Sequence, residues 1–142
     1  MPERFQENKF FDYYITYDFE SILSKIEDVR TDRLQYTNKH VPVSFSLFSN
    51  IPGYDKDPIF VCHNNVKELI DMFVKVLVDI SVKAYEINVK KYADVLDYLN
   101  RQIDIAVHDK DKSKAEHKYH KFMKWLHEVP VVGFNSVNMT LI

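Results

Sequence analysis

The feature that most constrains the fold is a stretch from residue 66 to residue 129 that contains neither glycine nor proline. A chain without these two residues meets no strong helix breaker, so the stretch favours helix wherever apolar residues recur at helical spacing. Its first part has such residues at Leu69, Ile70, Phe73, Val74, Leu77 and Ile80. Asn65 is a good N-cap residue, and Glu68 follows three positions later. The sequence therefore predicts a helix that begins at Val66.

The length of this helical segment leaves two alternatives open. Further apolar residues continue the stripe at Leu96, Leu99, Ile103 and Val107. The result is either one very long helix or two helices broken near 87–91. The charged run HDKDKSK at 108–114 is the expected hard break, after which a second amphipathic helix ends before Pro130. Residues 66–128 thus form a helical insert, and an exposed apolar stripe on it would allow two copies of the chain to associate.

Alternation with a period of two predicts strands on both sides of the insert. Residues 13–20 separate apolar from more polar side chains, and residues 41–48 alternate again. Pro, Gly and Asp residues separate the latter from the apolar run IFVC at 59–62. The run VVGF at 131–134 has the composition of a short buried strand. Residues 21–39 are charged, show no such pattern and are expected to form a loop with a helical turn.

This order of elements predicts a single domain of the mixed α/β (α+β) class, in which helices cover a mainly antiparallel sheet. A chain of 142 residues that is 46% hydrophobic is large enough for one core. We expect residues 13–20 to form the central strand, flanked by 41–48 and 59–62. The helix from Val66 would pack on one face.

Composition excludes several classes of protein. The only two glycines, Gly53 and Gly133, cannot build a Gly-rich dinucleotide-binding turn or a P-loop. The formal net charge of -2 does not indicate a strongly basic chain of the kind that binds nucleic acid or a membrane surface through its overall charge. Any such partner must be recognised locally.

The single cysteine, Cys62, excludes an internal disulfide and any multi-cysteine zinc site, and is expected to be a small buried hydrophobe. Residues 1–11 are charged where a signal peptide needs an apolar run, and no apolar run of about 18 residues is present. We therefore expect an intracellular protein, nuclear or cytoplasmic, that is not secreted and has no membrane partner.

Asp18 and Glu20 are the most informative pair of acids. Residues two apart on a strand point to the same face, with roughly 6 to 7 Å between their Cα atoms. Two carboxylates placed in this way can share a divalent ion, as two-metal phosphoryl-transfer sites require. The alternative is that both acids are merely solvated at the end of a strand.

A second group of candidates lies on the last predicted helix. His117, His120 and His127 fall roughly along one face, which would suit a metal ion or simply a solvated surface. Six lysines surround them, at Lys110, Lys112, Lys114, Lys118, Lys121 and Lys124. They form either a basic surface that binds a nucleic-acid strand weakly or an ordinary charged helix surface.

Three blocks of sequence carry a resemblance to a known family. They are YYITYDFES at 13–21, HVPVSFSLFSNIPGY at 40–54 and VVGFNS at 131–136. From about Phe10 onward the chain resembles the exonuclease region of protein-primed family B DNA polymerases, especially those of self-synthesising transposons and related viruses. The resemblance implies an incomplete ribonuclease H-like exonuclease fold and a role in DNA replication.

The resemblance also assigns roles to particular residues. Asp18 and Glu20, in the first motif, would be the catalytic residues and the ligands of Mg²⁺ or Mn²⁺. Phe134, Asn135 and Ser136, at the start of the second motif, would bind the single-stranded 3′ end of DNA.

The sequence departs from the family at Thr140, where the second motif has an Asp, and the third motif would lie beyond Ile142. A hydroxyl cannot replace a carboxylate in neutralising a pair of divalent ions. We therefore expect a fragment or degenerate copy of the 3′–5′ proofreading exonuclease domain, inactive as this chain. The alternative is a non-catalytic module derived from such a domain, which binds protein or single-stranded DNA.

Overall fold

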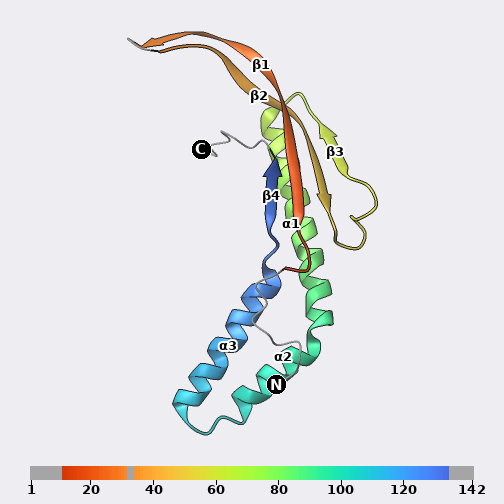
Figure 1. Ribbon diagram of the computed structural model, residues 1–142, viewed down its shortest axis with the longest axis vertical. Coiled ribbons are helices and arrows are strands. Elements are labelled where there is room, and N and C mark those ends of the chain that lie inside the picture. The colour runs from red at the N-terminus through yellow and green to blue at the C-terminus, as the bar shows by residue number, and fades with distance from the viewer. Residues whose placement is uncertain (1–10, 32–33, 135–142) are drawn as a thin grey trace. The chain divides into compact units, whose positions relative to one another are not determined.

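The computed structural model describes residues 11–31 and 34–134 (Figure 1). Its elements follow in the order β1 (Ile15–Thr31), β2 (Leu34–Ser49), β3 (Ile59–Cys62), α1 (Val66–Lys91), α2 (Ala93–Asp104), α3 (Asp109–His127) and β4 (Val131–Phe134). This is a mixed α/β architecture of the general α+β kind, as the sequence predicts.

Contacts between Cα atoms divide the described chain into two compact units. Residues 15–77 and 131–134 form a sheet unit, and residues 11–14 and 78–130 form a helical unit. The expectation of a single domain stays a prediction, and each unit is described by itself.

The sheet unit contains four strands in the order β3-β2-β1-β4. β2 is antiparallel to β1 and to β3, whereas β4 is parallel to β1. The first strand is therefore central, as its alternation predicts. The expectation that residues 59–62 flank it is wrong, because β3 pairs with β2 and the second neighbour of β1 is β4.

β1 and β2 continue together as a two-stranded ribbon beyond the ends of their neighbours (Figure 1). β4 pairs only with residues 15–18, and β3 pairs only with residues 44–47. The prediction of a loop at 21–39 is wrong, since most of that segment lies in the ribbon. Ile22 and Leu23, successive residues that point to opposite faces, are both exposed. Neither face is buried at this point, so the sequence lacks the alternation of a half-buried strand.

One face of the sheet packs on the first turns of α1. Phe73 of α1 contacts the rings of Tyr17, Phe19 and Phe45, with centroid distances of 5.0, 4.9 and 5.2 Å. Fully buried residues complete this core at Ile15, Phe45, Leu47, Ile51 and Leu69. Ile15, Phe45 and Leu47 are apolar positions of the alternating pattern, so that pattern sets which face is covered.

α1 begins at Val66, as predicted. The Asn65 side chain accepts a hydrogen bond from the Glu68 backbone N–H at 3.1 Å, which satisfies one of the amide groups left free in the first turn. His63 lies beside this cap and its Nε2 is 2.9 Å from Glu68 Oε2.

The helical insert consists of three helices, so residues 66–107 form the pair of helices that the sequence allows rather than one very long helix. α1 ends at Lys91, and Tyr92 (φ −109°, ψ 23°) leaves the helical conformation before α2 begins. The charged run at 108–114 is not the break, because α3 already begins at Asp109 and the break lies at residues 105–108. Pro130 follows the end of α3 at His127, as expected.

The helical unit has a separate core. Tyr92, Val95, Leu99 and Leu126 are buried together where α2 meets the C-terminal half of α3. The ring of Phe11 stacks on Trp125 at 6.3 Å between centroids. Phe11, in the described segment 11–14 before β1, thereby contacts the helical unit.

β4 and β3 are both more exposed than expected. Val131, Val132 and Phe134 are largely exposed, so the prediction of a buried strand at 131–134 is wrong; β4 has a paired neighbour only along β1. Cys62 is also exposed, contrary to the expectation of a buried thiol. None of the described helices is both long and apolar enough to cross a membrane.

Candidate functional site

Asp18 and Glu20 lie on the face of β1 that does not pack on α1. The odd-numbered residues Tyr17 and Phe19 contact Phe73, so the even-numbered residues point the other way. Glu20 is exposed and Asp18 is partly exposed. The two carboxylates therefore share one open face of the sheet, as their spacing predicts.

A row of four residues crosses the sheet at Asp18. Asp18 is opposite Phe134 of β4 on one side and opposite Ser46 of β2 on the other. Ser46 in turn is opposite Phe60 of β3. Paired residues on neighbouring strands point to the same face, and the strands are about 4.8 Å apart, so the row spans roughly 14 Å between its outer Cα atoms.

The two ends of this row are exposed aromatic rings. Phe60 keeps 67% of its surface accessible and Phe134 keeps 58%. A large apolar side chain so exposed gains little from burial in the fold. The next row along the strands consists of Glu20, Ser44 and Cys62. Ser44 is buried, so the open face has the carboxylates of Asp18 and Glu20 and the hydroxyl of Ser46 between two phenyl rings.

The structure brings together some of the residues that the sequence assigns to a site. Phe134 lies beside Asp18, which joins the third sequence block, at 131–136, to the first. Asn135 and Ser136 lie outside the described residues, so the roles that the resemblance gives them stay predictions.

The donors on this face do not fit a two-metal centre. Mg²⁺ and Mn²⁺ favour oxygen ligands, and two such ions held close together need several carboxylates to balance their charge. Within residues 11–31 and 34–134, no group of three or more His, Cys, Asp or Glu side chains is placed to hold a metal ion. Asp18 and Glu20 supply two carboxylates, which the partly exposed Ser46 can supplement only with a neutral hydroxyl, because Ser44 is buried.

Phe60 is the residue of this face that sequence reasoning missed. The signal that would have found it is the register of β3 against β2. Ile59 and Val61 are opposite the buried residues Leu47 and Phe45, which forces Phe60 and Cys62 to the open face.

The histidines of α3 do not form a metal site. His117, His120 and His127 are all exposed, and His127 stacks against Tyr85 with ring centroids 3.8 Å apart. The interpretation as a solvated helix surface therefore fits these three residues better than the metal alternative.

Comparisons with known proteins add no relative. A scan against models of protein families, a search of curated proteins and a search of solved structures each found no match to this chain.

Proposed function

We propose that this chain is a degenerate copy of the 3′–5′ exonuclease region of a family B DNA polymerase. It keeps the strand that carries the metal ligands and does not hydrolyse DNA on its own. The observation that carries the proposal is the pairing of Asp18 with Phe134 in neighbouring parallel strands. The first and third blocks of the resemblance, more than a hundred residues apart in sequence, meet in one row of the sheet.

The topology of the sheet unit supports a ribonuclease H-like fold. In that fold three antiparallel strands are followed by a helical segment and then by a strand that returns parallel to the first. The order β3-β2-β1-β4, with only β4 parallel to β1, has this connectivity. The insertion of three helices between β3 and β4 is compatible with it.

The small number of carboxylate ligands for a metal ion explains why we expect no hydrolysis of DNA. Two-metal phosphoryl transfer needs one ion to activate the nucleophile and another to stabilise the leaving oxygen. Losing either costs several kcal/mol of barrier, which is several factors of ten in rate. Asp18 and Glu20 alone hold at most one ion weakly, and Thr140 offers no charge.

Restoring the missing acid tests this proposal. Thr140→Asp should tighten Mn²⁺ binding about tenfold, since the number of charged ligands tunes affinity over decades. Paramagnetic broadening of resonances from residues 16–20 measures the affinity. Val137→Asp is the matched control because it adds the same charge to the same segment. Equal effects of the two substitutions, or no effect of Thr140→Asp, would contradict the proposal.

An activity assay tests the second half of the proposal. The purified chain and Asp18→Ala should degrade a labelled single-stranded oligonucleotide no faster than buffer with Mg²⁺ or Mn²⁺. Degradation by the unmodified chain that disappears in Asp18→Ala would show that a residue outside the described ones completes the site.

The exposed rings favour one second candidate, a non-catalytic module that binds single-stranded DNA. Bases stack on exposed aromatic side chains with little sequence preference. Phe60→Ala combined with Phe134→Ala should then weaken the binding of a fluorescent oligothymidylate, measured by fluorescence anisotropy in EDTA. Val78→Ala combined with Val82→Ala removes similarly exposed apolar groups elsewhere, and this control should not weaken the binding.

A further inference from the structure

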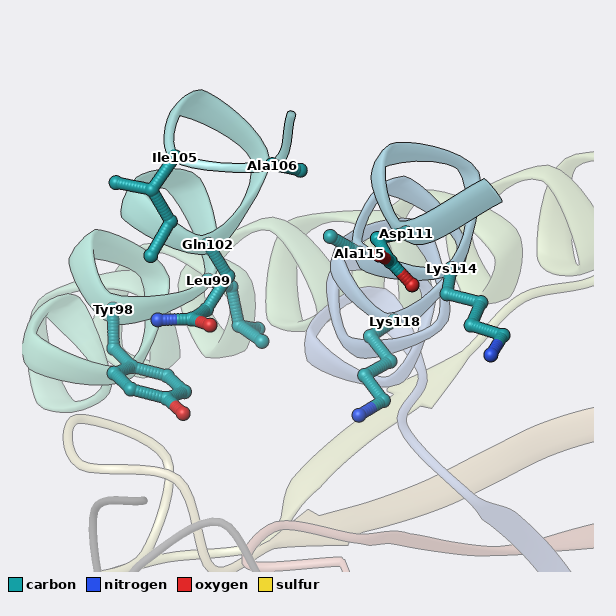
Figure 2. A pocket seen from close by; sticks show the side chains of 9 residues that line it. All are labelled: Tyr98, Leu99, Gln102, Ile105, Ala106, Asp111, Lys114, Ala115 and Lys118. Carbon is teal, nitrogen blue, oxygen red and sulfur yellow. The ribbon is translucent and has the colours of Figure 1, made fainter. Parts of the chain in front are cut away.

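A cleft of about 300 Å³ lies between α2 and α3, entirely within the helical unit (Figure 2). One face of each helix lines it, since its residues recur three or four positions apart, as Tyr98 and Gln102 do on α2. Ala106 and Ala115 contribute only a methyl group each, which leaves space between the helices near their connecting loop. Leu99 belongs both to the lining and to the buried core of the unit.

The polar side chains of this cleft are available for a ligand. They are Tyr98, Gln102, Asp111, Lys114 and Lys118. In the part of the chain that the structure describes, none of the five has a side-chain hydrogen bond or ion pair with another residue. Figure 2 shows the Tyr98 ring and the Lys118 side chain extending to the same edge of the cleft. An aromatic face and an ammonium group therefore lie at one opening.

The charge around the cleft is positive. Lys114 and Lys118 outnumber the single carboxylate of Asp111, and α3 as a whole carries six lysines against three acids. Asp111 is in the first turn of α3, where the positive end of the helix dipole compensates its charge. Lys118 extends to the edge that Tyr98 reaches, whereas the Lys114 side chain extends away from α2 (Figure 2). The positive charge of this part of α3 disfavours a cationic ligand and favours an anion.

We propose that the cleft between α2 and α3 binds a nucleotide phosphate, either of a free mononucleotide or of a single-stranded nucleic acid. Lysine ammonium groups pair with phosphate as point charges. The Tyr98 ring offers a face on which the attached base stacks, and the Gln102 amide both donates and accepts hydrogen bonds. The volume is at the lower end of the range for small-molecule sites, which suits a single nucleotide. The proposal does not depend on the open face of the sheet.

Calorimetry at low ionic strength tests the proposal with three probes. These are adenosine 5′-monophosphate, a short oligothymidylate and inorganic phosphate. At least one of the two nucleotide probes should bind more tightly than inorganic phosphate, because only nucleotides offer a base to Tyr98. Methyl resonances of Ala106 and Ala115 should shift on titration, which places the ligand in the cleft.

Paired variants separate the cleft from general electrostatic attraction. Lys114→Ala combined with Lys118→Ala should weaken binding about five- to twentyfold, because an exposed charge pair contributes a factor of roughly two to five. Lys110→Ala combined with Lys112→Ala removes the same charge from the same helix outside the cleft, and should have at most half that effect on a logarithmic scale. Tyr98→Leu should weaken nucleotide binding and leave phosphate binding unchanged. Asp111→Asn should tighten both.

The results of these experiments either identify the source of the ligand or overturn the proposal. Binding of the mononucleotide identifies a free nucleotide as the ligand source, and binding of the oligothymidylate alone identifies a nucleic-acid strand. Absence of binding by both nucleotide probes at millimolar concentration would overturn the proposal. Equal losses in the two lysine pairs would also overturn it. The methyl resonances of Ala106 and Ala115 report on the cleft alone, which keeps this test distinct from any binding at the sheet.

Discussion

The carboxylate of Asp12 accepts a hydrogen bond of 2.6 Å from the hydroxyl of Tyr92, which is 80 positions later in the chain. The Lys91 ammonium donates to the same oxygen at 2.9 Å. Both partners lie where α1 ends and α2 begins. The segment before β1 therefore attaches to the helical unit at its first break.

We expect Tyr92→Phe to lower the free energy of unfolding of the helical unit by about 1 to 2 kcal/mol, because it removes a hydrogen bond to a charged acceptor. Urea unfolding followed by the fluorescence of Trp125, the single tryptophan, measures this loss. Tyr119→Phe is the control and should change the free energy by less than about 0.5 kcal/mol. Equal losses in the two variants would show that the hydroxyl of Tyr92 contributes no specific stability.

The same contact should make stability depend on pH. Burial alone would raise the pKa of Asp12, but the hydrogen bonds from Tyr92 and Lys91 outweigh it and hold the pKa below its ordinary value of 3.8. A carboxyl whose pKa is lower in the folded state stabilises the fold above the pKa of the unfolded chain. This contribution is lost as the pH falls through the lower, folded value. The difference in unfolding free energy between the unmodified chain and Asp12→Asn should shrink when measured from pH 5 down to pH 2.

Removal of the helix cap should destabilise α1 at a defined point. Asn65→Ala deletes the oxygen that accepts from the Glu68 backbone, and a lost N-cap typically costs about 1 kcal/mol. Urea unfolding followed by circular dichroism measures it. Asn64→Ala changes the adjacent exposed amide and should cost much less. Asn65→Asp keeps an acceptor oxygen and should retain most of the stability; a loss as large as that of Asn65→Ala would contradict the capping role.

Two phenylalanines on opposite faces of the sheet should differ strongly when truncated. Phe73→Ala removes the ring that packs on Tyr17, Phe19 and Phe45, and we expect a loss of about 2 to 3 kcal/mol. Phe60→Ala removes an exposed ring and should stay within about 0.5 kcal/mol. Chemical unfolding of the two variants gives both values. A similar loss in both would mean that the open face is covered in solution.

The core of the helical unit allows an equivalent comparison. Leu126→Ala creates a cavity among Tyr92, Val95 and Leu99 and should cost about 3 kcal/mol. Val107→Ala, at a residue that is 89% exposed, should be close to neutral. The midpoint of the Trp125 fluorescence transition reports both. No shift for Leu126→Ala would indicate that this cluster does not hold α2 and α3 together.

The sequence predicts those parts of the fold that obey a local rule. The cap at Asn65 and the alternation around Phe45 both depend on neighbours within a few positions, and both are present in the structure. The ribbon at 21–39 could not be predicted in this way. At Ile22 and Leu23, where both faces are exposed, no apolar face repeats, so the pairing leaves no periodic signal there.

The break at Tyr92 directly follows residues 87–91, where the sequence left open either a break or one very long helix. Neither glycine nor proline marks it, and its partner Asp12 lies in a distant part of the chain. Local propensity favours continuing the helix, whereas a long-range hydrogen bond and the burial of the Tyr92 ring accompany the interruption.

The two acidic residues of the candidate site could be predicted from the sequence, but the residues around them could not. The spacing of Asp18 and Glu20 alone places both on one face. Phe60 joins them only through the register of β3 against β2, which period-two patterns do not specify when a strand has four residues.

The parallel pairing of β4 with β1 has a consequence for how the chain is made. Ile15 meets Val131 only after the whole helical insert has been synthesised, so this edge of the sheet closes last. Contacts across such a separation slow folding, because a long loop must be closed before the strand adds any stability. Until then the N-terminal end of β1 presents open backbone groups, which are a template for pairing with other chains. Nascent chains stalled within the insert should therefore be the species most prone to aggregate and most dependent on chaperones.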